Sequence, residues 1–140
     1  MRLMDDRGSA AIEAVIVAPV VVLLISLVIF GGRVALAHQA AQSIAADAAR
    51  AASLQRTASQ ARAAANKATE AGINQRLPCA SHDLTLDLAG FAKPVGTPAS
   101  VTATMTCTLT TAELALPGLA GLITVRATMS SPLDTRRERR

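Results

Sequence analysis

Three patterns of apolar and polar positions follow one another along this chain of 140 residues, and the first is an uncharged run over Ala14–Gly32. Its 19 residues would form a helix about 29 Å long, close to the ~30 Å thickness of bilayer hydrocarbon. We therefore predict a short polar leader over residues 1–8 and a transmembrane helix over residues 9–32. Pro19 is expected to bend this helix, because proline removes a backbone donor and clashes with the preceding turn.

The second pattern is an alanine-rich stretch over residues 33–72 with scattered Gln, Arg, Asp and Glu. No proline interrupts it, alanine is the best helix former, and Gly72 followed by Asn74 predicts its end. We therefore predict that the apolar run continues into one amphipathic helix, about 90 Å long in all.

Small apolar residues recur in this stretch at a heptad-like spacing, which predicts a packing face for a closely approaching helix. The alternative is a solvated alanine-rich helix with no partner. The two sets of positions are Ala37, Ile44, Ala51, Ala58 and Ala65, and Ala40, Leu54, Ala61 and Ala68, with Asp47 as a polar intrusion.

The third pattern alternates with a period of two, which predicts strands over His82–Leu88, Val101–Thr110 and Leu122–Met129. In the second strand, five threonines face away from the apolar side. Three short strands with one apolar face need a partner, so we expect a small antiparallel sheet over residues 78–131 packed on the helix. The predicted fold class is α+β and pilin-like, with a basic disordered tail over residues 132–140.

Composition gives little support for catalysis. The only aromatic residues are Phe30 and Phe91, so a large aromatic core is excluded. His38 and His82 have no metal-ligand spacing and no nucleophile motif around them, and we expect both at the surface. We therefore predict no enzymatic activity, no cofactor and no metal.

The net charge of +4 is concentrated near the C-terminus, at Arg136, Arg137, Arg139 and Arg140. No aromatic residue interleaves with these arginines and no recognition fold is visible, so we do not expect a nucleic-acid partner. A solvated tail, attracted at most to an anionic surface, is the simpler interpretation.

Cys79 and Cys107 are the only cysteines, and no CxxC motif accompanies them. A disulfide between them would stabilise the fold by about 3 kcal/mol and would place this region outside the cytoplasm. Two independent buried thiols are the alternative.

The junction between the leader and the apolar run is the most informative site. Glu13 lies at the start of the apolar run. An ionised carboxylate there costs on the order of 2–3 kcal/mol in lipid, so a positive charge is needed to compensate it. Gly8 ends the polar leader, and small residues follow it. Type IV pilins and pseudopilins have this arrangement and are cleaved after the glycine.

A narrower resemblance is carried by Arg7–Ala14 (RGSAAIEA) running into Val15–Pro19 (VIVAP). This segment resembles the start of TadE-like proteins, the minor pseudopilins of Flp-type, or tight-adherence, pilus systems. Ala40–Ala52 is similar to the helix that follows the span in that family, and Leu116–Leu119 and Thr124–Met129 are similar to its closing loop and last strand. Ala14 stands where the major pilins have an aromatic residue, which favours a minor subunit.

The resemblance implies cleavage between Gly8 and Ser9 by a prepilin peptidase. The new α-amino group of Ser9 would lie one helical turn from Glu13 and would neutralise it. It also implies a single-pass protein of the cell membrane, with a cytoplasmic N-terminus and an extracytoplasmic C-terminal part. The partners would be other pilins or pseudopilins and the assembly platform, with incorporation into a pilus and a role such as cell adhesion.

Two alternatives remain open. Ala35–Ala37 is an A-x-A site, so a signal peptidase could cleave before His38 and release a secreted domain. The long apolar run, the acid at its entrance and the intervening Arg33 argue against this. The chain could also be an unprocessed single-span adaptor of a membrane complex. Counting charges on the two sides of the span does not settle its orientation.

Overall fold

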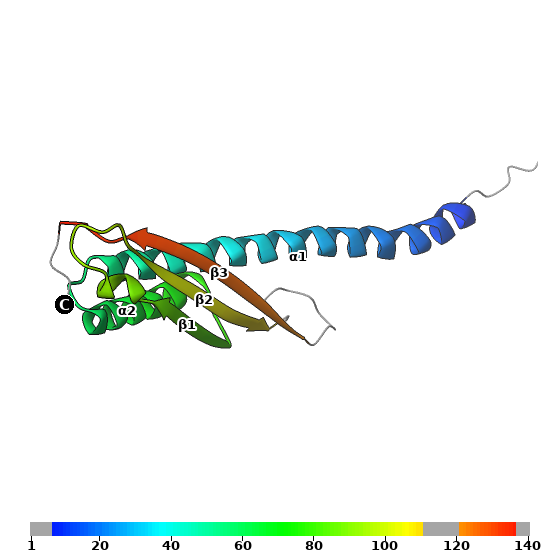
Figure 1. The fold of residues 1–140 in the computed structure, drawn as a ribbon. Helices are drawn as coiled ribbons and strands as arrows, with labels where there is room; N and C mark the ends of the chain where they lie inside the picture. Colours follow the sequence, from blue (N-terminus) through cyan, green and yellow to red (C-terminus); the bar gives the residue numbers. More distant parts are fainter. Residues whose placement is uncertain (1–6, 111–120, 137–140) are drawn as a thin grey trace, which may run out of the picture.

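The computed structural model describes residues 7–110 and 121–136, with side chains from residue 13 onward. Its elements are a long helix, a second helix, and three strands with a 3-10 turn between the first two. In chain order they are α1 (Arg7–Ser53), α2 (Ala58–Arg76), β1 (Ser81–Asp87), η1 (Ala89–Ala92), β2 (Ser100–Thr110) and β3 (Leu122–Pro132). Figure 1 shows α1 projecting far beyond a small domain built around its C-terminal half. The predicted α+β fold with a long apolar N-terminal helix and a three-stranded sheet is confirmed.

The single helix predicted through residues 33–72 is wrong, because the chain turns back after Ser53 and α2 packs against α1. The turn is stabilised locally, since the side chain of Thr57 accepts a hydrogen bond from the Gln60 N–H at 3.2 Å. A threonine in extended conformation followed three residues later by glutamine is a common helix start. The Thr57–Gln60 sequence therefore contained the signal for a second helix, and no proline was needed to end the first.

Gly72 does not end the helix as predicted; it lies buried inside α2, which continues to Arg76. A Cβ atom added at Gly72 would stand 2.7 Å from Cγ1 of Ile44 on α1. The glycine therefore permits a close approach of the two helices. The helix ends at Arg76, and Leu77 after it is extended, because the following Pro78 disfavours helical conformation at Leu77.

The sheet has the order β1-β2-β3, and both pairs are antiparallel. The alternation predicted from the sequence is confirmed, since the five apolar residues of β2 are all buried (Val101, Ala103, Met105, Cys107 and Leu109). Opposite them the threonines of β2 are only partly covered, and Thr104 and Thr128 bring their hydroxyl oxygens to 3.0 Å across the strands.

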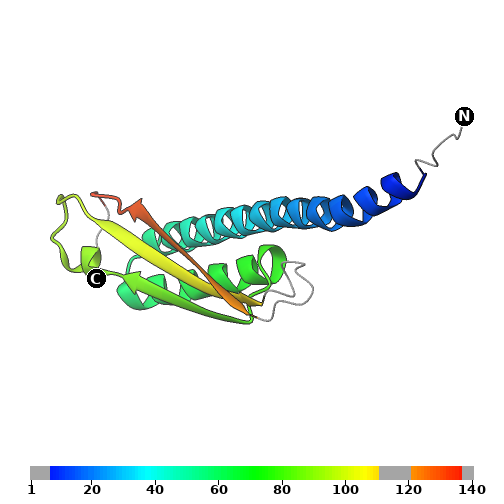
Figure 2. The ribbon, with the colours of Figure 1, turned by 90° about the vertical axis from the view of Figure 1, so that its right-hand side faces the viewer.

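The two helices form one layer and the sheet forms the other (Figure 2). Helix α1 packs under β2 and β3, and α2 reaches β1. Between the layers lies a core made mostly of alanines from α1 and the inward side chains of the sheet. Ala41, Ala45, Ala48 and Ala52 are fully buried, but none of them belongs to the two heptad-like sets predicted as the packing face. Of those sets, Ala37, Ile44, Ala61 and Ala65 are buried, whereas Leu54 is 58% exposed. The predicted face is therefore only partly correct, because the spacing assumed one helix where the chain has two. The buried alanines of α1 pack against α2 and the sheet of the same chain.

The folded part extends slightly further than predicted at its C-terminus. Strand β3 runs to Pro132, and Leu133 is 5% exposed with its N–H donating to the Ala99 carbonyl at 2.8 Å. The disordered tail predicted over residues 132–140 is therefore wrong at its start, because Pro132 and Leu133 belong to the folded domain. Residues 137–140 and the closing-loop segment Leu116–Leu119 lie outside the described residues.

Cys79 and Cys107 form a disulfide with a Cα–Cα distance of 5.5 Å. Cys79 lies in the connection between α2 and β1, and Cys107 is buried in the central strand. The bond therefore ties the end of α2 to the middle of the sheet across a sequence separation of 28 residues. Of the two alternatives left by the sequence, the structure has the disulfide.

Replacing Gly72 by valine should lower the free energy of unfolding by about 1–3 kcal/mol, because the new side chain overlaps Ile44 and forces the helices apart. The matched change Ala71→Val lies on the exposed side of α2 and should cost less than about 0.7 kcal/mol. Denaturant unfolding of the full chain in detergent, followed by circular dichroism, measures both. Equal losses in the two variants would contradict the close packing at Gly72.

Removing the disulfide through the double change Cys79→Ser and Cys107→Ser should lower the free energy of unfolding by about 3 kcal/mol. In the parent chain neither thiol should react with a maleimide until a reductant is added. Alkylation followed by a non-reducing gel reads this directly. Labelling of both cysteines without reductant would show that the bond is absent.

Candidate functional site

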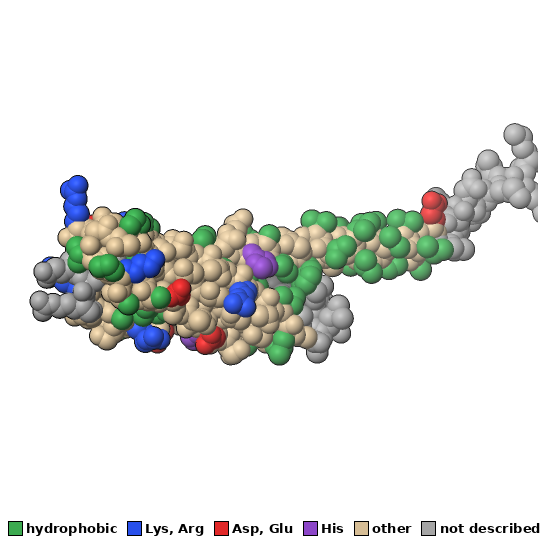
Figure 3. Space-filling view, in the orientation of Figure 1, with side chains coloured by type: hydrophobic (Ala, Val, Ile, Leu, Met, Phe, Trp, Pro, Cys, Tyr) green, Lys and Arg blue, Asp and Glu red, His purple; other side chains and the backbone are tan. Residues whose placement is uncertain are grey.

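The apolar part of α1 is the most unusual surface of the molecule. From Glu13 to Gly32 its side chains are exposed or, at Ser26 and Phe30, only partly covered. An 18-residue window of the helix has a mean hydropathy of 3.0 and no buried residue. On the face seen in Figure 3, this apolar surface is a projecting rod. One helix of the described chain is thus long and apolar enough to cross a membrane.

The exposure is far greater than soluble proteins tolerate for contiguous apolar surface. Val15 is 73% exposed and Val28 is 75% exposed, although both are large aliphatic residues. Gly31 and Gly32 have no atom within 4 Å of an added Cβ. The helix therefore gains no packing at these residues from the described part of its domain, and its apolar side chains need lipid or other helices to leave water.

The predicted processing site lies at the start of this helix. Gly8 and Ser9 belong to the first turns of α1, whose backbone is helical from Arg7. Glu13 follows at the fourth position after Ser9, which places the two residues on one face of the helix. The carboxylate of Glu13 is exposed. The leader residues 1–6 lie outside the described part of the chain.

Helix α1 is continuous through the junction between its apolar part and the domain. Arg33 is exposed, and one turn later Ala37 is the first residue of α1 that the domain buries, at 7% exposure. Pro19 is contained within the helix, which curves toward its N-terminal end in Figures 1 and 2. The uncovered and covered halves of α1 therefore form one element without a flexible linker.

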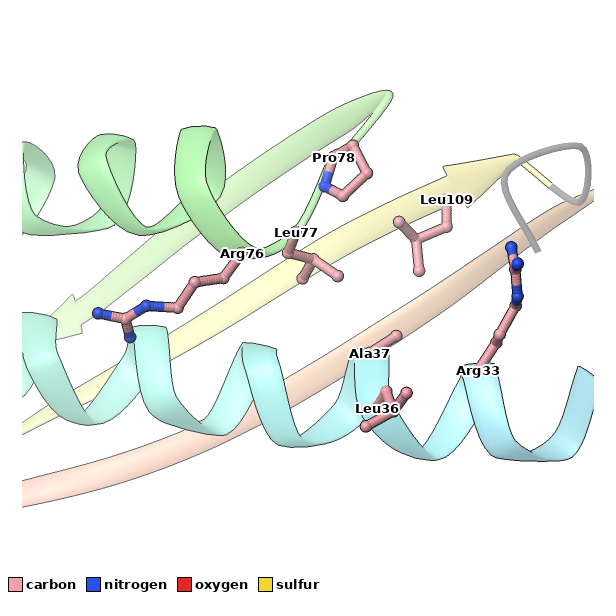
Figure 4. Close-up of a pocket in the computed structure, with 7 residues that line it drawn as sticks. All are labelled: Arg33, Leu36, Ala37, Arg76, Leu77, Pro78 and Leu109. Atoms are coloured by element: carbon pink, nitrogen blue, oxygen red, sulfur yellow. The ribbon is translucent and has the colours of Figure 1, made fainter. Parts of the chain in front are cut away.

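A cavity of about 210 Å³ opens beside this junction. Figure 4 shows α1 on one side of it, the end of α2 and Pro78 on another, and β2 behind. Its lining is mainly apolar, with two arginines as the charged members (Arg33, Leu36, Ala37, Arg76, Leu77, Pro78 and Leu109).

The two arginines of this cavity point in different directions (Figure 4). The Arg76 guanidinium turns back along α1, where it donates to the Asp47 carboxylate at 2.8 Å and to the Ser43 hydroxyl at 2.6 Å. These exposed contacts connect the end of α2 to α1 and contribute little energy individually. Only the side-chain stem of Arg76 is therefore available to line the cavity.

Other features of the described residues give no indication of a reaction centre. His38 and His82 are exposed, as predicted. His82 lies beside Asp83 and Glu70 in a shallow polar depression, but no group of three or more His, Cys, Asp or Glu among the described residues could hold a metal ion.

Some elements of the site were missed by the sequence analysis. The cavity at the junction depends on Leu77, Pro78 and Leu109 meeting α1, and no local pattern in the sequence indicates that meeting. The turn after Ser53 could have been found from the Thr57–Gln60 capping signal, and with it the return of α2 toward the apolar part of α1.

Comparison with known proteins finds a match over the N-terminal part of the chain. Residues 8–50 match the model of a protein family described as TadE-like protein. The matched segment includes Gly8, Ser9 and Glu13, the whole apolar run and the buried alanines of α1 as far as Ala49, and it ends before α2. No curated protein and no solved structure matches the chain. Residues 8–50 are therefore similar to the TadE-like family, in agreement with the resemblance found in the sequence.

Proposed function

We propose that this chain is a minor pseudopilin that takes part in assembling a Flp-type, or tight-adherence, pilus. It is held in the membrane by the apolar part of α1 until it joins other pilin-like subunits. The role requires no catalysis by this chain, which acts as a substrate of processing and then as a packing unit. Its partners are the prepilin peptidase, other pilins or pseudopilins and the assembly platform.

The observation that carries this proposal is the uncovered apolar half of α1. Its 19 uncharged residues match the thickness of bilayer hydrocarbon, and the described domain covers none of that window. A helix that is apolar all round is suited first to lipid and then to a bundle of similar helices. Because α1 is continuous with the domain, moving the helix from lipid to a bundle would move the domain with it.

The junction residues support processing between Gly8 and Ser9. Before cleavage Glu13 has no described cation within reach, and a carboxylate at the hydrocarbon boundary is costly. Cleavage would create an α-amino group at Ser9, one helical turn away on the same face. The amine would neutralise the carboxylate within one subunit or across two neighbouring subunits, so processing and assembly would be coupled through one charge pair.

The disulfide supports an extracytoplasmic location for the domain. Disulfides persist in oxidising compartments and are rare in the cytoplasm. With Cys79 and Cys107 outside, a single span over residues 9–32 places the leader in the cytoplasm, where the peptidase would cut it.

The two alternatives receive less support. Cleavage before His38 would cut α1 within its continuous helix and remove Ala37, which is buried in the core. An unprocessed adaptor would leave Glu13 at the mouth of the span without the amine that compensates it. Both alternatives are distinguished from the proposal by the residue at the mature N-terminus.

Gly8→Ala should abolish processing, because the peptidase would act after glycine, and the chain should keep residues 1–8. The parent chain, expressed with an active prepilin peptidase, should begin at Ser9. Gly31→Ala is the matched control, since an added Cβ meets nothing there, and it should be processed normally. Intact-mass measurement shows whether the leader is present in the parent chain and in each of the two variants. A parent chain that begins at His38 would support a signal peptide, and an uncut parent would support the adaptor.

Glu13→Ala should leave insertion and processing intact and reduce recovery of the chain with other pilus subunits several-fold, because the amine at Ser9 loses its partner. Glu70→Ala removes an exposed acid from α2 and should have no such effect. Co-purification from membranes, with the mature mass as a check on processing, separates the two. Normal recovery of the Glu13 variant would refute the charge pairing.

A further inference from the structure

We propose that the membrane-facing end of the domain lies in the lipid headgroup layer, so that the sheet rests on the bilayer and does not stand away from it. The contact is made by three exposed apolar residues, Leu36, Pro78 and Leu122, which we call the proximal rim. This inference rests on the proposed membrane span and adds a second, separate contact with lipid.

The depth of the rim follows from the continuity of α1. If Ala14–Gly32 fills the hydrocarbon, Leu36 lies four residues further along, which is about 6 Å beyond it. The headgroup region on each side of a bilayer is roughly 5–8 Å thick. Leu36 is 64% exposed, and the cavity it lines also includes Pro78. Both residues are therefore at the level of the headgroups.

The sheet reaches the same level. Leu109 of β2 lines the same cavity as Arg33 and Leu36 of α1. Leu109 pairs with Ile123, so Leu122, the first residue of β3, lies at this end of the sheet. Leu122 is 69% exposed, which leaves a large aliphatic side chain uncovered at the edge nearest the membrane. In Figure 1 the start of β3 lies at the end of the sheet on the side of the projecting half of α1.

The charge of the cavity suits a lipid surface. Among the described residues that line it, Arg33 is the cationic one at the side of the span, Arg76 contributes only its stem because its guanidinium pairs with Asp47, and the other five are apolar. Apolar side chains flanked by arginine are suited to the boundary between acyl chains and phosphates, where long cationic side chains extend toward the headgroups. Leu36, Pro78 and Leu122 would thus continue the apolar surface of the span onto the domain.

Fluorescence can test this contact without background, because the chain contains no tryptophan or tyrosine. Leu122→Trp is the decisive variant, since the span alone does not require position 122 to be near lipid. The full chain is placed in vesicles of phosphatidylglycerol and phosphatidylcholine. We expect emission shifted to shorter wavelength, strong quenching by nitroxide attached to lipid headgroups, and several-fold weaker quenching by aqueous iodide than for a distal control.

The distal control is Val95→Trp, at an exposed apolar position in the connection before β2, at the other end of the sheet. It should be quenched by iodide and not by labelled lipid. Val22→Trp, inside the span, should be quenched by nitroxide placed deep in the acyl chains, and its failure to do so would refute the span itself.

If the span control behaves as expected and the indole at position 122 responds like the one at position 95, the rim contact is refuted. An indole at position 122 that is shielded from both lipid label and iodide would show that protein, such as a second copy of the chain, covers the rim. That result would also overturn the proposal.

Discussion

The structure depends on one helix that must satisfy two environments at once. From Ala14 to Gly32, α1 presents apolar side chains on every face, and the described part of the chain buries none of them. From Ala37 onward the same helix is the central support of a small domain, and its inward alanines are buried against α2 and the sheet. Because no break separates the halves, the position of the domain is determined by the direction of the apolar half.

Alanine and glycine make this arrangement possible with very few aromatic residues. A core of small side chains buries little area per residue, so its stability depends on close approach and on many atom pairs at van der Waals distance. Gly72 against Ile44 is the clearest case. The disulfide then adds a covalent connection between the end of α2 and the central strand, where a small domain benefits most from a crosslink.

The sequence was sufficient to predict the strands and the uncovered helix, but not the helical packing face, whose heptad spacing assumed one continuous helix. The period of two placed three strands and their inner faces correctly, and the uncharged run identified the uncovered helix. It was not sufficient for the turn after Ser53, because alanine-rich sequence is compatible with continued helix and only the cap at Thr57 indicates otherwise. The role of Gly72 was also predicted wrongly. Local sequence shows only that glycine often follows the end of a helix, whereas here glycine lies inside α2 and permits the contact with Ile44. The cavity at the junction depends on residues far apart in the chain, which no local pattern reveals.

The short distance between span and domain has a mechanical consequence. Only the turn between Gly32 and Ala37 separates the apolar half of α1 from the first buried residue. A helix of this kind transmits rotation about its axis, so any change in how the apolar half packs would turn the domain as well. A domain that rests on lipid through Leu36, Pro78 and Leu122 would lose that contact when α1 leaves the bilayer. The free energy of the rim contact would then favour the membrane-held state and oppose extraction, and the free energy of packing between assembled subunits would have to exceed it.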